Sequence, residues 1–185
     1  MEEKICKFIF ELGQLRRVQR EGWKLCGIKK PESVAEHSLR AAQIGYLLAS
    51  MEEYKHPEEV CTILVFHDIG ECRIGDIHKV ANRYIKSGEE KAVKEQLEPL
   101  EISDEILSLW KKCEYKRNTA GVIAKDADLL DMAATAKEYI EQGFTSARDW
   151  FDKTSKRIQT ESGKLLFKKL KDMSSVEWWK DLKKI

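Results

Sequence analysis

Apolar residues recur along most of the chain at the three- and four-residue spacing of amphipathic helices, and alternating apolar–polar runs are few. The pattern predicts helices at about 3–17, 33–53, 57–69, 88–97, 103–113, 119–141, 146–172 and 175–183. Ser33 and Glu36 have the spacing of a capping box, and Gly70 and Gly143 stand where helices should stop. We therefore expect an all-α protein, a helical bundle.

The length of 185 residues suits one domain, because domains commonly run to roughly 100–200 residues. No internal repeat, low-complexity tract or interdomain linker interrupts the chain. We predict a single domain over residues 1–185, with a motif-bearing core at about 1–150 and C-terminal helices at about 146–183. The segments 18–32 and 70–87 are the longest non-periodic parts, and function often concentrates on such segments when helices hold them.

Charge and cysteine content exclude several classes of protein. The 33 Lys and Arg residues balance 32 Asp and Glu residues to a net charge of +1, which gives no general attraction to nucleic acid or membranes. The five cysteines are odd in number and lack C-x-x-C spacing, as expected of reduced thiols. The first residues, Met1-Glu2-Glu3-Lys4, do not resemble a secretory signal. We expect a cytoplasmic protein with neither a nucleic-acid polymer nor a membrane as partner.

Two histidines are predicted to point inward. His37 shares an apolar helix face with Ala41 and Leu48, and His67 ends an apolar run and is followed by Asp68. Inward polar groups must be paired or must bind a metal ion. Imidazole and carboxylate ligands without a thiolate suit Mn, Fe, Co, Ni or Zn.

A further candidate ligand comes from the apolar helix at about 119–141, which contains Asp126, Asp128 and Asp131. Both Asp126 and Asp128 align with apolar residues one turn away on either side. Periodicity therefore leaves open which aspartate is a ligand and which are caps or surface groups.

The ordered set His37, then His67-Asp68, then Asp128 resembles the H…HD…D pattern of the HD metal-dependent phosphohydrolase superfamily. Neighbouring segments resemble the small HD-domain 5′-deoxynucleotidases more specifically, over about residues 1–150. These segments are the N-terminal helix with the R-x-G-W loop (12–23), the first histidine motif (31–38), the HDxxE…GD segment (67–77) and Ala127-Asp128-Leu129, which favours Asp128 over Asp126.

The resemblance implies that His37, His67, Asp68 and Asp128 bind one divalent metal ion, which could be Co, Mn, Zn, Ni, Fe or Mg. It further implies that Glu71 orients or deprotonates the attacking water. Asp76 would protonate the leaving oxygen or bind sugar hydroxyls, Arg20 would hold the phosphate, and Trp23 would pack on the nucleotide near the sugar 2′ position.

The expected activity is hydrolysis of deoxyribonucleoside 5′-monophosphates to deoxynucleoside and phosphate, by a homodimer. Two alternatives stay open: an HD phosphohydrolase acting on a triphosphate, cyclic nucleotide or alarmone, and a non-catalytic helical binding protein with a vestigial metal site. Selectivity for deoxyribose over ribose is also open. So are the role of His78 and the choice of Arg16, Arg17 or Arg20 as the phosphate ligand.

Overall fold

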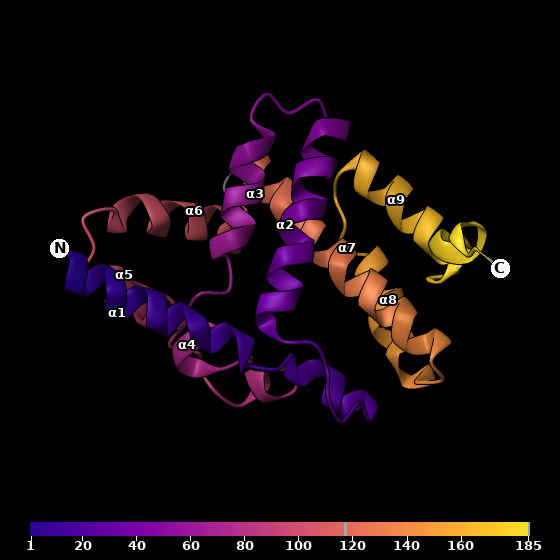
Figure 1. The fold of residues 1–185 in the computed structure, drawn as a ribbon, viewed down its shortest axis with the longest axis horizontal. Coiled ribbons are helices and arrows are strands. Elements are labelled where there is room, and N and C mark those ends of the chain that lie inside the picture. The colour runs from indigo at the N-terminus through magenta and orange to yellow at the C-terminus, as the bar shows by residue number, and fades with distance from the viewer. Residues whose placement is uncertain (117, 185) are drawn as a thin grey trace.

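The computed structural model describes residues 1–116 and 118–184, and Figure 1 shows them as an assembly of helices. The α-helices are α1 (Glu2–Leu12), α2 (Val34–Met51), α3 (Pro57–Phe66), α4 (Glu71–Ile74), α5 (Glu89–Leu97), α6 (Ser103–Tyr115), α7 (Thr119–Glu141), α8 (Arg148–Ser155) and α9 (Glu161–Asp172). Short 3-10 helices are η1 (Gly13–Arg16), η2 (Glu21–Cys26), η3 (Ala81–Arg83), η4 (Thr145–Ala147) and η5 (Glu177–Leu182). No strand forms in these ranges, so the predicted all-α fold is confirmed.

Helices α2, α3 and α7 form the centre of the fold, with α1, α4, α5 and α6 on one side and α8 and α9 on the other (Figure 1). The larger hydrophobic cluster fills the contacts among α2, α3, α7, α8 and α9 and includes Leu48, Ile63 and Leu130. A smaller cluster joins α5 and α6 to the turn after α3 and includes Ile69 and Trp110. His37 lies on α2, His67 and Asp68 lie on the turn after α3, and Asp128 lies on α7.

Gly45 sets how closely α2 approaches α3. A Cβ atom at this position would lie 2.3 Å from Leu64 Cδ1 and 3.2 Å from Val60 Cγ1. Carbon atoms do not approach to 2.3 Å without displacement, so a larger residue would push the two helices apart. This close contact lies between the helix that carries His37 and the helix that leads into His67.

The capping box predicted at the start of α2 is present. Ser33 Oγ accepts from the Glu36 amide at 3.2 Å, and Glu36 Oε2 accepts from the Ser33 amide at 2.6 Å. The first predicted helix is shorter than expected, because α1 ends at Leu12 and continues as η1. The helix predicted at 57–69 ends at Phe66, so His67 lies on a turn.

The helix predicted at 146–172 is wrong as a single element. It is divided into α8 and α9 by residues 156–160. Thr160 caps α9 by accepting from the Gly163 amide at 3.1 Å, and Asp126 Oδ2 accepts from the amides of Gln159 at 2.9 Å and Thr160 at 2.6 Å. The Asp126 carboxylate thus gives the amides of Gln159 and Thr160 hydrogen-bond partners that a helix would otherwise have to supply. The last element, predicted at 175–183, is the 3-10 helix η5.

All five cysteines (Cys6, Cys26, Cys61, Cys72 and Cys113) are free thiols, as expected. Cys26 and Cys113 are buried and act as small apolar side chains. Among residues 1–116 and 118–184, no helix combines the length and apolarity needed to cross a membrane.

Candidate metal centre and substrate cavity

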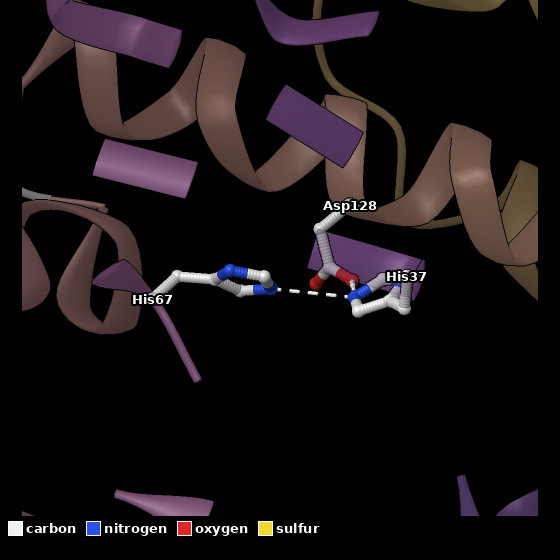
Figure 2. A group of neighbouring side chains, drawn as sticks. All are labelled: His37, His67 and Asp128. Atoms are coloured by element: carbon white, nitrogen blue, oxygen red, sulfur yellow. Dashed lines mark hydrogen bonds and ion pairs between the residues drawn. The ribbon is translucent and has the colours of Figure 1, made fainter. Parts of the chain in front are cut away.

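Four side chains from distant parts of the sequence converge at the centre of the fold. Figure 2 shows His37 of α2, His67 of the turn after α3 and Asp128 of α7 pointing toward one another. His37 Nε2 lies 3.3 Å from His67 Nε2 and 3.3 Å from Asp128 Oδ1. Asp68 Oδ2 lies 3.2 Å from His67 Nε2 and 3.6 Å from His37 Nε2. The structure thus brings together all four residues of the predicted ligand set.

The hydrogen bonds of the two histidines orient their lone pairs toward each other. His67 Nδ1 donates to the Leu64 carbonyl at 2.7 Å, and His37 Nδ1 donates to Asp131 Oδ2 at 2.5 Å. In the neutral tautomers that these bonds favour, each Nε2 presents a lone pair to the other at 3.3 Å. Two facing lone pairs flanked by carboxylates are a donor set for a cation, and they fit a divalent metal ion.

The electrostatics of the cluster also call for positive charge. Burial and the nearby Arg20 lower the pKa of His37, but hydrogen bonds to Asp128 and Asp131 outweigh them and raise it to about 9. Burial lowers the pKa of His67. The carboxylates therefore favour one positive charge at this point, which a proton or a bound metal ion can supply.

Asp131 is also held through its second carboxylate oxygen, the one that does not bond His37. Its Oδ1 accepts a hydrogen bond from Arg40 Nε, and the Arg40 guanidinium also donates to Thr135 Oγ1 and, at 2.7 Å, to Glu138 Oε1. Burial alone would raise the pKa of Asp131, but His37 and Arg40 lower it below its ordinary value. Asp131 is therefore an ionised acceptor that orients the His37 ring.

A cavity of about 160 Å³ opens beside the four-residue cluster and is lined by Asp68 and Asp128. Four other residues singled out in the sequence line it: Glu71, Asp76, Arg20 and Trp23. His78 lines it as well. The predicted site residues other than the two buried histidines thus share one cavity.

Glu71 is the most unusual group in this cavity. Its Oε2 is buried and has no hydrogen-bond partner in the described part of the chain. Burial, followed by repulsion from Asp68 and Asp76, raises the pKa of Glu71 to about 10. An unpartnered carboxyl oxygen next to a cation site is placed to interact with a water molecule or another group in the cavity.

Arg20 is the one of the three candidate arginines that lines the cavity, whereas Arg16 and Arg17 are exposed. Its Nη1 donates to Asp68 Oδ2 at 3.2 Å. Burial opposes its charge, but Asp68, Asp128, Asp76 and Glu71 together raise the pKa of Arg20 above its ordinary value.

Trp23 is buried and forms part of the same wall. Its Nε1 donates to Glu32 Oε1 at 3.2 Å, and its ring packs 5.3 Å from the ring of Tyr139, measured between centroids. Glu32 also accepts from Thr135 Oγ1 at 3.4 Å. Since Thr135 bonds to Arg40, a partly buried polar network connects the Trp23 wall to Asp131, which bonds His37.

Several residues of the site went unrecognised in the sequence. Lys125 Nζ lies 2.7 Å from Asp128 Oδ2 and lines the cavity, one helical turn before Asp128. Glu89 also lines the cavity. The i, i+3 spacing of Lys125, Asp128 and Asp131 was the available signal, since such residues share a helix face.

The chain matches the HD domain family over residues 12–170. The chain belongs to the HD domain family. The match reaches farther toward the C-terminus than the resemblance read from the motifs, which covered about 1–150. The ordered motifs are therefore those of a family member, and the resemblance to HD phosphohydrolases is confirmed.

Individual relatives agree with the family assignment. The 5′-deoxynucleotidase HDDC2 of Xenopus laevis is 31% identical over 165 residues, covering 85% of this chain and 81% of the relative. The 5′-deoxynucleotidase hdd1 of Schizosaccharomyces pombe is 32% identical over 155 residues, covering 78% and 76%. A solved structure of a conserved hypothetical protein from Pyrococcus furiosus superposes on this HD domain protein with a TM-score of 0.78 and 29% identity, covering 91% of this chain and 99% of that one.

Proposed function

We propose that this HD domain protein is a metal-dependent phosphomonoesterase that hydrolyses deoxyribonucleoside 5′-monophosphates to deoxynucleoside and phosphate. The observation that carries the proposal is the convergence of His37, His67, Asp68 and Asp128 beside a cavity lined by acidic and basic side chains. The names of the relatives from Xenopus laevis and Schizosaccharomyces pombe support the substrate class.

His37 Nε2, His67 Nε2, Asp68 and Asp128 would hold one divalent ion. When bound, such an ion supplies Lewis acidity, which makes water more acidic and neutralises phosphoryl charge. These donors are nitrogen and oxygen atoms and include no thiolate, which suits first-row ions and Mg²⁺.

The chain's own groups would do the remaining work. Glu71 is placed to orient the attacking water, because its unpartnered Oε2 is beside the cluster, and it would take a proton from that water once the charge of a bound divalent ion lowers its raised pKa. Attack at phosphorus breaks the bond to the 5′ oxygen, and Asp76 would give that oxygen its proton or would bind sugar hydroxyls. Arg20 would bind the phosphate oxygens through its guanidinium, and the Lys125 ammonium would add a second positive charge.

The wider proposal has three further parts. Residues 1–185 would form a single HD domain, Trp23 would pack on the nucleotide near the 2′ position, and the enzyme would act as a homodimer in the cytoplasm. These parts are supported by the resemblance to the small HD-domain nucleotidases, and the cytoplasmic location also by the free thiols.

The test is phosphate release from paired deoxy and ribo 5′-monophosphates, after chelation and re-addition of Co²⁺, Mn²⁺, Mg²⁺ or Zn²⁺. Metal-dependent release from the deoxy forms is the expected result. Triphosphates and cyclic nucleotides are tested in parallel by chromatography of their products, since a cyclic nucleotide opens to a monophosphate without releasing phosphate, and hydrolysis of these nucleotides alone would overturn the substrate class. No release from any nucleotide with any of these ions would contradict enzymatic function.

A further inference from the structure

A second cavity, of about 340 Å³, continues from the one beside the metal centre. The two share Lys79, Met132, Trp150 and Arg157 in their walls, so they meet along one continuous surface. The second cavity does not reach the four-residue cluster or Glu71, and the hydrolytic chemistry proposed above makes no use of it.

Helix α7 gives the combined cavity a direction. Asp128 lies in the first cavity, and Met132, one turn later, lines both. Four helical residues advance about 6 Å. A molecule whose phosphate binds Arg20 beside the metal centre would therefore extend its other end past Met132 and into the second cavity.

The second cavity has an apolar wall built around an indole. Leu25, Val80, Met132 and Trp150 line it, and the Trp150 ring packs 5.6 Å from the ring of Trp23, measured between centroids. Such a wall favours a flat aromatic group, which stacks on an indole and buries apolar surface.

Polar groups at the edge of this cavity are bonded mainly to one another. Lys153 pairs with Asp149 at 2.8 Å, and Thr154 Oγ1 donates to the Trp150 carbonyl at 2.8 Å. Lys79 and Arg157 stand at the junction between the two cavities. Both are donors, so they suit the carbonyl oxygens and ring nitrogens of a nucleobase.

We propose that the second cavity is the base-binding subsite of the enzyme, with the indole of Trp150 as its stacking platform. The inference rests on the proposed nucleotidase function. It adds an assignment of the phosphate, the sugar and the base to separate parts of the combined cavity. The phosphate lies at Arg20 and Lys125 beside the metal centre, the sugar passes Trp23, and the base lies against Trp150 between Leu25 and Val80.

The experiment compares kcat/KM for a deoxyribonucleoside 5′-monophosphate with kcat/KM for 2-deoxyribose 5-phosphate, which lacks the base. Trp150→Leu should lower the ratio of the two values about tenfold or more, because one base–aromatic stack has this size. An equal loss on both substrates would mean that Trp150 only supports Trp23 and Gly22, and would overturn the proposal.

Leu25→Glu is the second variant. Leu25 lines the second cavity and not the first, and its side chain is 51% exposed, so the change leaves the hydrophobic core unaltered. It should lower the same ratio by placing a charge on the apolar wall. Leu39→Glu on α2 is the matched control: Leu39 is 63% exposed, lines neither cavity, and should leave the ratio unchanged.

Failure of the nucleotidase function would be distinguishable from failure of the subsite. If neither substrate is hydrolysed, calorimetric binding of a free deoxynucleoside to the protein still tests the cavity. Binding that is lost in both Trp150→Leu and Leu25→Glu would support the subsite, whereas no binding to the unaltered protein would overturn it. The protein could instead prefer a triphosphate. If that preference is lost when Lys79 and Arg157 are replaced and is kept in Trp150→Leu, the second cavity binds phosphate and the proposal is overturned.

Discussion

Asp131 accepts the Nδ1 proton of His37 at 2.5 Å, and both side chains are completely buried. The bond leaves Nε2 of His37 as the atom that faces His67 and Asp128. A carboxylate behind an imidazole fixes its tautomer and strengthens it as a ligand. Arg40 in turn keeps Asp131 ionised and in place.

Replacing Asp131 should therefore weaken metal binding without removing a ligand. We expect Asp131→Ala to lower the affinity for Co²⁺ about 10- to 100-fold, measured by calorimetry or by the visible absorption of bound Co²⁺. Asp126→Asn is the matched control on the same helix, because Asp126 bonds to backbone amides before α9 and not to the cluster. Unchanged Co²⁺ affinity in Asp131→Ala would contradict the orienting role.

Glu71→Gln separates catalysis from metal binding. If Glu71 Oε2 accepts a proton from water, turnover should fall about 10²- to 10⁴-fold, while the bound metal content measured by atomic absorption stays that of the unaltered protein. Glu95→Gln, at an exposed position on α5, is the control. A Glu71→Gln protein that keeps full turnover would rule out the proposed proton transfer.

Lys125→Met should weaken the hold on phosphate. A charge-assisted hydrogen bond contributes about 1.5–3 kcal/mol, so inhibition by inorganic phosphate should become roughly 10- to 100-fold weaker. Lys125→Arg keeps the positive charge and should restore much of the inhibition. If Lys125 acts only by pairing with Asp128, metal affinity will change in Lys125→Met and phosphate inhibition at saturating metal will not.

Glu89 should make the metal-free protein less stable as the pH rises. Burial, then repulsion from Asp68, raises the pKa of Glu89 from 4.5 to about 7. A carboxyl with a higher pKa in the folded state favours folding only while protonated, so the free energy of unfolding falls between about pH 4.5 and 7. Glu89→Gln should raise that free energy by about 1–3 kcal/mol at pH 8 and change it little at pH 4.5. Urea unfolding at both pH values measures this, and an equal effect at the two would contradict it.

Gly45→Ala should destabilise the protein through the contact of α2 with α3. Its Cβ would lie 2.3 Å from Leu64 Cδ1, and overpacking of this kind costs about 1–3 kcal/mol. Gly13→Ala is the control, because the nearest atom to the added Cβ is Arg16 Nη2 at 3.5 Å, an ordinary contact, and the backbone there has a negative φ. Equal melting temperatures for the two variants would show that the helices adjust without cost.

Helical periodicity was enough to place His37 and His67 inside the fold, because an apolar stripe along a helix identifies its buried face. It failed to separate Asp126, Asp128 and Asp131, since all three are buried. What distinguishes them is the partner that each meets in space: the amides before α9, the facing histidines, and the pair of His37 and Arg40.

The break between α8 and α9 was missed for the same reason. Residues 156–160 leave the helix partly because the amides of Gln159 and Thr160 bond to Asp126, more than thirty residues earlier in the chain. The spacing of apolar residues within one segment cannot reveal a contact between residues so far apart in the sequence. Lys125 and Arg40 read as ordinary surface charges on helices until their partners are known.

Helix α7 has two roles. Asp128 faces the histidines of the metal centre, whereas Asp126 accepts from the amides of Gln159 and Thr160 and so attaches the segment before α9. Loss of this carboxylate would release the segment at 156–160 and loosen α9, whose Phe167 packs 4.7 Å from Phe151 between ring centroids. A protease would then cut an Asp126→Ala protein first between α8 and α9, while the nicked enzyme would keep its metal centre, because no residue of that centre lies beyond Asp131.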